Sequence, residues 1–168
     1  MRELLNQAML MLAGKGAIFV GQGVRYDGVW TYDSLDGVPE EQRIEMPVAE
    51  ELQLGICTGL AMQGFLPVCI YPRFDFLLRA MDQLVNHLDK INQMSQGQWN
   101  PKVIIRTRVG TRTPLDAGPQ HTQDHSCSVA TMLTSIVVAK INCPNEIEGT
   151  YRDAAERDGS TLVVEAMP

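Results

Sequence analysis

The chain has 168 residues, of which 14 are basic and 20 are acidic, so its formal net charge is −6. That length suits one ordinary domain, and a composition that is 45% hydrophobic and 20% charged excludes wholesale disorder. The acidic balance argues against nucleic acid and anionic membranes as partners, because both are bound by basic surfaces.

The first seven residues carry an acid and two amides and contain no small-residue cleavage site, so they do not resemble a signal peptide. The uncharged run from Leu52 to Pro72 is long enough to cross a membrane, but glycines, glutamines and Pro67 interrupt it. A buried helix followed by a buried strand explains this run better than a membrane span does.

The cysteines lie within or beside apolar runs and have no C-x-x-C spacing. They are Cys57, Cys69, Cys127 and Cys143. An even number of cysteines does not by itself indicate disulfides in a chain of this length and hydrophobicity. We therefore expect reduced thiols in the core and a cytoplasmic location.

Short apolar runs alternate with helical patterns along the chain. The predicted strands are residues 17–20, 66–71, 103–105, 136–139 and 162–164. The predicted helices are residues 4–12, 49–62, 75–94 and 145–157. The third helix is expected to turn inward its apolar residues Leu77, Leu78, Met81, Leu84, Val85 and Leu88. This order predicts one doubly wound α/β domain over residues 1–168, with a mainly parallel sheet covered by helices on both faces. Ligands of such sheets bind beyond the carboxyl ends of the strands.

Two clusters of polar residues follow the predicted third strand. His121 and His125 are four residues apart, but Gly118 and Pro119 indicate a loop and no third ligand is near. We therefore expect no metal site and a hydrogen-bonding role for a loop histidine. Three arginines, Arg106, Arg108 and Arg112, could face an anion at the carboxyl edge of the sheet. Their spacing alone favours solvated loop charges.

Gly21 and Gly23 lack the third glycine of a dinucleotide fingerprint, and the chain has no P-loop, so we expect no independent NAD or ATP site. Glu50 and Glu51 lie in the first turn of the predicted second helix. The helix dipole explains acids there, although one of the two could instead face a cleft and exchange a proton. Side chains at adjacent helical positions point in different directions, so only one of the two carboxyl groups can face inward.

Several motifs occur in one order along nearly the whole chain. They are residues 4–9 (LLNQAM), 24–28 (VRYDG), 47–50 (PVAE), 74–76 (FDF), 80–86 (AMDQLVN), 97–99 (GQW) and 120–123 (QHTQ). Together they resemble the beta subunit of the thiamine-diphosphate-dependent 2-oxo acid dehydrogenases of the pyruvate and branched-chain types. The resemblance implies the thiamine-diphosphate-binding fold, as a pyrimidine-type domain.

The resemblance also implies roles for individual residues. Glu50 would hydrogen-bond the aminopyrimidine ring nitrogen of thiamine diphosphate and favour the imino tautomer that activates the cofactor. Phe76 would stack against the pyrimidine, and His121 would be the active-site loop histidine near substrate and diphosphate. Tyr26 and Asp27 would line the same entrance.

The diphosphate and magnesium motif of these enzymes, Gly-Asp-Gly followed by Asn, is absent. The resemblance therefore implies an alpha-type partner subunit that holds the diphosphate and Mg²⁺, in a hetero-oligomer of alpha-two beta-two type with self-association. Asp158 is a weak candidate for the monovalent cation that the family's domain can hold. The family's beta subunit continues into a second domain beyond the position of Glu165, so we expect only the pyrimidine-binding domain here and leave open a lipoyl-linked complex.

Two functions follow as hypotheses. The first is an enzyme subunit that, with its partner chain, decarboxylates a small 2-oxo acid and passes the acyl or hydroxyalkyl unit to an acceptor. Within it, a pyruvate dehydrogenase-like subunit and a transketolase-like or compact decarboxylase subunit are both open. The second is a non-catalytic assembly or regulatory subunit that has kept the fold, which would not need Glu50, Phe76 and His121 together.

Overall fold

Six parallel strands form the sheet of this computed structural model, which describes residues 1–113 and 116–167. The strands are β1 (Ala17–Gly21), β2 (Arg43–Glu45), β3 (Leu66–Tyr71), β4 (Ile104–Arg108), β5 (Val137–Ile141) and β6 (Thr161–Glu165). Their order across the sheet is β2-β1-β3-β4-β6-β5, and every neighbouring pair is parallel. The predicted parallel α/β sheet is confirmed.

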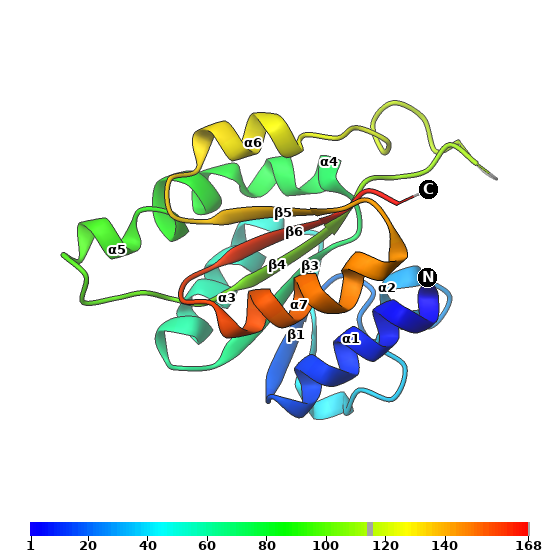
Figure 1. Cartoon of the computed structure of the whole chain (residues 1–168), viewed down its shortest axis with the longest axis horizontal. Coiled ribbons are helices and arrows are strands. Elements are labelled where there is room, and N and C mark those ends of the chain that lie inside the picture. The colour runs from blue at the N-terminus through cyan, green and yellow to red at the C-terminus, as the bar shows by residue number, and fades with distance from the viewer. Residues whose placement is uncertain (114–115, 168) are drawn as a thin grey trace.

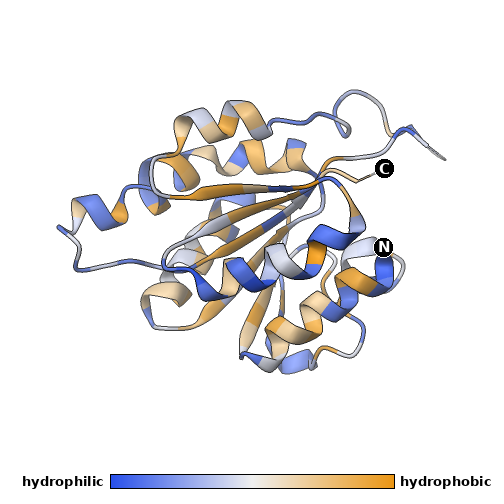
Figure 2. Cartoon of the chain, viewed as in Figure 1, coloured by the Kyte–Doolittle hydropathy of each residue, from blue (hydrophilic) through white to orange (hydrophobic). Residues whose placement is uncertain are grey.

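Helices cover both faces of this sheet (Figure 1). They are α1 (Arg2–Gly14), α2 (Trp30–Asp33), α3 (Glu50–Met62), α4 (Phe74–Leu77), α5 (Ile91–Met94), α6 (Ser126–Met132) and α7 (Ile147–Glu156). In Figure 1, α1 and α7 lie side by side on one face, and α3, α4 and α6 lie on the other. Colouring by hydropathy shows the strands as largely apolar and the helices as two-sided (Figure 2). This is the pattern that burial of both sheet faces requires.

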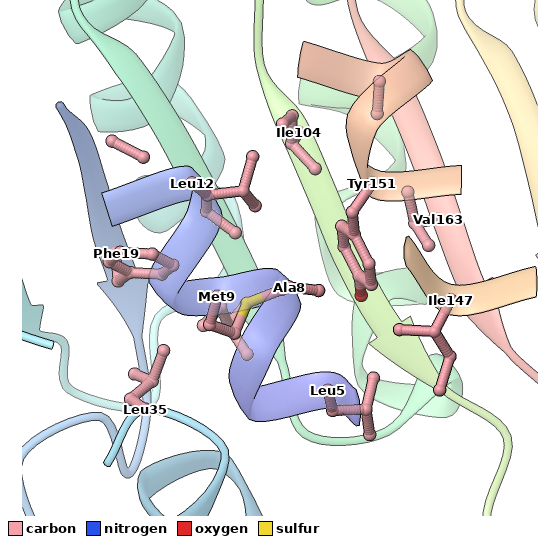
Figure 3. Packing of buried hydrophobic residues seen from close by; sticks show 14 of the residues in the cluster. Leu5, Ala8, Met9, Leu12, Phe19, Leu35, Ile104, Ile147, Tyr151 and Val163 are labelled. Atoms are coloured by element: carbon pink, nitrogen blue, oxygen red, sulfur yellow. The ribbon is translucent and has the colours of Figure 1, made fainter. Parts of the chain in front are cut away.

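The core on the α1 side contains the apolar face of that helix. Leu5, Ala8, Met9 and Leu12 recur at helical spacing and are all buried. Figure 3 shows them against Phe19 of the sheet on one side and against the α7 residues Ile147 and Tyr151 on the other. A single amphipathic face therefore joins the first strand to the last helix.

The core on the opposite face is built by the alternate residues of the same strands. On β1, Phe19 faces the α1 side while Val20 faces α3, and on β4 Ile104 and Ile105 divide in the same way. Both members of each pair are fully buried. Strands buried on both faces explain why the sequence shows continuous apolar runs instead of alternation.

Three short elements were not predicted from the sequence. They are α2 and β2, which lie between β1 and α3, and α6, directly after His125. Each has seven residues or fewer, and their burial comes from neighbours distant in sequence; β2, for example, pairs with β1. Short elements of this kind carry little periodic signal.

The long helix predicted over residues 75–94 is not a regular α-helix. After α4 the chain forms a 3₁₀ turn (Leu78–Ala80) and a π-helix (Gln83–Leu88) before α5 begins. Leu77, Leu84 and Leu88 are buried as expected, but Leu78 is 41% exposed, so its inward placement is wrong. The changed winding rotates the apolar face relative to an ideal helix.

Asp89 ends the π-helix and ties it to the segment before β5. Its buried carboxylate accepts hydrogen bonds from the backbone N–H groups of Thr134, Ser135 and Ile136 at 2.8–3.0 Å, and from Lys90 Nζ at 2.6 Å. Burial opposes ionisation of this carboxyl, but these hydrogen bonds outweigh it and hold its pKa well below the usual range.

The expectation that Arg106 is a solvated loop charge is wrong. It lies on β4, is fully buried, and donates from Nε to Glu165 Oε1 of β6 at 2.7 Å and from a terminal nitrogen to Ser34 Oγ at 2.7 Å. Tyr151 donates to the same Glu165 oxygen at 2.6 Å. Burial alone would lower the pKa of Arg106, but the Glu165 charge outweighs it and raises that pKa, which keeps the cation.

The prediction of core thiols holds for Cys57 and Cys69, which are buried and free. It is wrong for Cys127, which is exposed, and for Cys143, which is half-buried. Cys127 lies on α6, and Cys143 directly precedes the 3₁₀ turn Pro144–Glu146 that leads into α7. Within residues 1–113 and 116–167, no helix combines the length and the apolar character needed to cross a membrane.

Candidate functional site

Glu50 is the first residue of α3, at the end of the sheet where the parallel strands terminate. It is only 4% exposed, whereas Glu51 points to solvent, so the inward member of the pair is Glu50. Tyr71, the last residue of β3, donates from its hydroxyl to the Glu50 carbonyl oxygen at 2.8 Å. The strand thereby fixes the start of the helix and the position of the carboxyl group.

The carboxylate of Glu50 has weak partners for a buried charge. Gln22 Nε2 lies 3.4 Å from Oε1, and Arg79 Nε lies 3.4 Å from Oε2. Both distances exceed those of a strong charge-assisted hydrogen bond. The side chain of Arg79 is 77% exposed and can leave without unpacking the core. Glu50 is therefore shielded from water while both of its oxygens can still take a better donor.

A cavity of about 610 Å³ over the first turn of α3 is lined by both Glu50 and Glu51. Two further cavities meet at Phe76, close to Glu50. The first, about 510 Å³, is lined by Gln22, Val48, Glu50, Phe76 and Arg79. The second, about 360 Å³, is lined by Gln22, Gly23, Val29, Trp30, Thr31, Pro72, Arg73, Phe76 and His121. We call them the Glu50 cavity and the His121 cavity. Gln22 and Phe76 line both cavities. The structure therefore brings Glu50 and His121 close to the same aromatic ring, that of Phe76.

His121 lies on the long loop between β4 and α6. Figure 1 shows this loop beyond the carboxyl ends of the strands. Its ring meets the ring of Phe76 edge-on, with centroids 5.4 Å apart and an interplanar angle of 86°. Its Nδ1 is buried and has no hydrogen-bond partner among the described residues. A buried, unpartnered ring nitrogen is suited to bind a ligand that enters the cavity.

Two contacts hold this loop in place. A Cβ on Gly110 would overlap the His121 carbonyl oxygen, so only glycine permits the backbone approach. Gln123 Nε2 donates to Asp75 Oδ1 at 2.8 Å, and Asp75 precedes the ring that His121 contacts. The Gly110 approach closes the loop on itself, while Gln123 and His121 attach it to the adjacent α4 residues Asp75 and Phe76.

Other residues named from the sequence lie apart from these cavities. Tyr26 is 67% exposed and lines neither cavity, and the Asp27 carboxylate accepts from Gly28 N at 2.7 Å; their site roles stay predictions. Asp158 is exposed. His125 lies just before α6, with Nε2 3.9 Å from Asp75 Oδ1, and outside a helix as expected. Across residues 1–113 and 116–167, no group of three His, Cys, Asp or Glu side chains could hold a metal ion.

Gln22, Arg79 and Arg73 are among the lining residues that were not predicted to belong to the site. Gln22 sits between two glycines directly after β1, at the strand end where ligands bind, and this position was the signal. Arg79 follows Phe76 by three positions and so shares its side of the turn. Arg73, directly before α4, had no signal beyond its place after β3.

The sequence pattern of the transketolase pyrimidine binding domain family matches residues 1–167, which is nearly the whole chain. The chain belongs to this family. The resemblance found in the sequence is thereby confirmed at the level of the domain.

Curated relatives of this pyrimidine-binding domain include pyruvate dehydrogenase E1 beta subunits. The one from Chaetomium thermophilum is 32% identical over 171 residues, which cover 97% of this chain and 43% of the relative. The one from Rickettsia bellii is 27% identical over 169 residues, covering 98% of this chain and 51% of the relative. A beta-2 subunit from Oryza sativa subsp. japonica is 32% identical over 127 residues, covering 73% and 33%. The chain thus spans about a third to a half of the length of these relatives.

A solved structure described as a split gene transketolase, inactive beta4 tetramer, superposes on this pyrimidine-binding domain with a TM-score of 0.74. The match covers 98% of this chain and 50% of that one at 16% sequence identity. At 16% sequence identity, this likeness shows that the two proteins share a fold. It agrees with the open parallel sheet and its helices on both faces.

Proposed function

We propose that this domain is the pyrimidine-binding half of a thiamine-diphosphate-dependent enzyme that acts on a small 2-oxo acid together with a partner chain. The observation that carries the proposal is the buried, weakly partnered carboxylate of Glu50 beside the ring of Phe76. Family membership and the pyruvate dehydrogenase beta relatives support the choice of cofactor and reaction class.

The lining of the Glu50 cavity fits a flat heteroaromatic ring with a protonatable nitrogen. Glu50 would hold a proton at the aminopyrimidine ring nitrogen through a short charge-assisted hydrogen bond. Phe76 would pack against the ring, and Val48 would exclude water from it. When bound, thiamine diphosphate supplies the nucleophilic carbon and the electron sink for decarboxylation of a 2-oxo acid. His121, on the other side of Phe76, would hydrogen-bond the substrate.

A partner chain is needed because the Glu50 cavity offers no site for the diphosphate and its Mg²⁺. Its lining has a single carboxylate, Glu50, and a single side-chain amide, Gln22, which lies against Glu50, whereas a bound magnesium diphosphate requires several carboxylate or amide oxygens as well as main-chain donors. We propose an alpha-type subunit that carries these groups, in a hetero-oligomer of alpha-two beta-two type. A cytoplasmic location stays a prediction.

The test compares Glu50→Gln with Glu51→Gln, its exposed neighbour, in the reconstituted pair of chains. The first variant keeps the shape and removes the charge, and we expect it to lower the rate of 2-oxo acid consumption by roughly 10²–10⁴-fold, as loss of a proton-transfer group does. Glu51→Gln should keep the parental rate. Both variants should unfold at the parental temperature, which separates chemistry from folding.

Near-parental turnover by Glu50→Gln would contradict the mechanism and favour the non-catalytic assembly or regulatory role. The acceptor is identified in the same assay by offering a lipoyl domain and then free aldehydes or sugars. Acylation of the lipoyl group indicates a pyruvate dehydrogenase-like subunit, whereas transfer to an aldehyde indicates a transketolase-like one.

A further inference from the structure

The second histidine of the long loop has no part in the proposed function. The ring of His125 meets that of Phe74 edge-on, with centroids 5.5 Å apart and an interplanar angle of 90°. Its side chain is 20% exposed, and its Nε2 is buried without a hydrogen-bond partner among residues 1–113 and 116–167. A buried ring nitrogen without a partner is costly, so we expect a group that can bind it close by.

Asp75 is the complementary group. Its side chain is 6% exposed, and its Oδ1 accepts a hydrogen bond from Gln123 Nε2 at 2.8 Å. Its Oδ2 is buried and has no partner in the part of the chain that the structure describes. His125 Nε2 lies 3.9 Å from Oδ1, whereas a hydrogen bond from a ring N–H to a carboxylate is about 2.7–2.9 Å long. A movement of about 1 Å therefore joins a buried ring nitrogen to a carboxylate that can accept further hydrogen bonds.

The Asp75 carboxylate lies at the centre of an ordered set of contacts between the loop and α4. Successive residues of α4 contact every second residue of the loop, in reverse order. The pairs are Phe74 with His125, Asp75 with Gln123, and Phe76 with His121. The outer two pairs are ring contacts, and the middle one is a hydrogen bond, which fixes both distance and direction. The position of the His121 ring is therefore linked to the carboxylate between the two phenylalanines.

The carboxylate also selects the protonation form of His125. A neutral imidazole carries its proton on one of its two nitrogens. With the proton on Nε2 the ring donates to Asp75, whereas with the proton on Nδ1 a lone pair faces the negative charge. The Nε2 donor gives Asp75 a second hydrogen bond besides that of Gln123, and two donors restrain the rotation of the carboxylate.

We propose that His125 and Asp75 are positioning residues for His121. His125 donates its Nε2 proton to the Asp75 carboxylate, and that carboxylate holds the loop through Gln123. The His121 ring is thereby kept at the wall of its cavity. The effect on turnover rests on the proposed function, because a displacement of about 1 Å at a group that binds substrate can lower the rate by about a hundredfold.

The test compares two replacements of His125 that separate its hydrogen bond from its packing. His125→Gln places an amide N–H near the position of Nε2 and lacks the ring. His125→Phe keeps a ring against Phe74 and lacks the donor. His87→Gln is the control, because His87 is an exposed residue of the π-helix and lies outside this set of contacts. Thermal unfolding of each variant establishes that it is folded at the temperature of the measurements.

NMR of the isolated full chain, which contains three histidines, measures the protonation form and the loop position. At a pH where the imidazoles are neutral, the ¹⁵N shifts should place the proton of His125 on Nε2. The ring-current shift that Phe76 imposes on His121 should persist in His125→Gln and in the control, and should be lost in His125→Phe. A role for His125 in packing alone predicts the reverse order of the two variants.

Turnover by the reconstituted pair of chains measures the catalytic consequence. The rate of 2-oxo acid consumption by His125→Gln should exceed that by His125→Phe roughly tenfold or more. Equal rates would show that the hydrogen bond does not serve the reaction and would overturn the role of the pair in turnover.

Two NMR results would overturn the proposal outright. One is a neutral His125 that carries its proton on Nδ1. The other is a set of His121 signals in His125→Gln that is no closer to the parental set than that of His125→Phe. Neither result depends on a partner chain or a substrate. If the parental pair consumes no 2-oxo acid, the proposed function fails, and the NMR comparison still decides whether His125 and Asp75 position His121.

Discussion

The buried ion pair between Arg106 and Glu165 offers a quantitative test of how the carboxyl edge of the sheet is held together. The Arg106→Met variant keeps much of the side-chain volume and removes the charge. It leaves the Glu165 carboxylate, 2% exposed, with the Tyr151 hydroxyl as its only remaining hydrogen-bond partner among the described residues. It also removes the donor to Ser34.

Breaking a buried pair in this way costs about 3–5 kcal/mol, because an uncompensated charge stays in the core. The total stability of a domain is about 5–15 kcal/mol, so the variant should lose a large part of it. Adding Glu165→Gln removes the stranded charge and leaves an amide oxygen for Tyr151. The double variant should therefore recover about 2 kcal/mol or more of the loss, a coupling typical of directly paired residues.

Equilibrium unfolding in urea, followed by far-ultraviolet circular dichroism at neutral pH, measures these differences. Arg112→Met, at an exposed loop position, is the control and should change stability by less than about 0.5 kcal/mol. A loss below about 1 kcal/mol for Arg106→Met would refute the reasoning. So would a double variant that is no more stable than the single one.

Three other predictions address single contacts. Asp89→Asn should lower stability by about 1–3 kcal/mol at neutral pH. Because the folded-state pKa of Asp89 is depressed, the difference between the parent and this variant should be full above the unfolded value of about 4 and should shrink as the pH falls below it, in urea unfolding at several pH values. Gly110→Ala should displace the loop and abolish the ring-current shift that Phe76 imposes on His121, read by NMR; unchanged His121 signals would contradict the close approach. Tyr71→Phe should cost about 1 kcal/mol through loss of its hydrogen bond to the Glu50 carbonyl, and an unchanged urea midpoint would show that this bond contributes nothing.

The layered fold was largely predictable, because the signal lies within each segment. All five predicted strands exist, and β3 has the predicted bounds of residues 66–71. The second predicted helix is α3, which begins at Glu50 and ends at Met62. The elements that failed depend on partners far along the chain: β2 needs β1 to pair with, and the π-helix ends on contacts between Asp89 and residues 134–136.

The site was less predictable from residue patterns alone. Glu50 and Glu51 are equivalent as neighbours in a first turn, and a motif shared with a family was needed to prefer Glu50 before burial distinguished them. Arg106 looked like a loop charge because its partner Glu165 is 59 positions away. Arg73 gave no signal beyond its place after β3, because its weak partnering among the described residues is a property of the folded chain.

The polar groups that hold the fold together differ in their hydrogen-bond partners from those that line the cavities. Asp89 and Arg106 both have a charged partner and further donors or acceptors at 2.6–3.0 Å, so their charges are compensated, although Arg106 Nη2 and Glu165 Oε2 have no hydrogen-bond partner among the described residues. Glu50 has its two contacts at 3.4 Å, Arg73 has one at 3.5 Å, and the Nδ1 of His121 has none among the described residues. These three line two cavities that share Phe76. Polar groups that lack strong partners and lie close together are suited to bind ligands that complete their hydrogen bonds. The incompletely satisfied groups around Phe76 therefore mark the surface on which cofactor, substrate and partner chain are expected to meet.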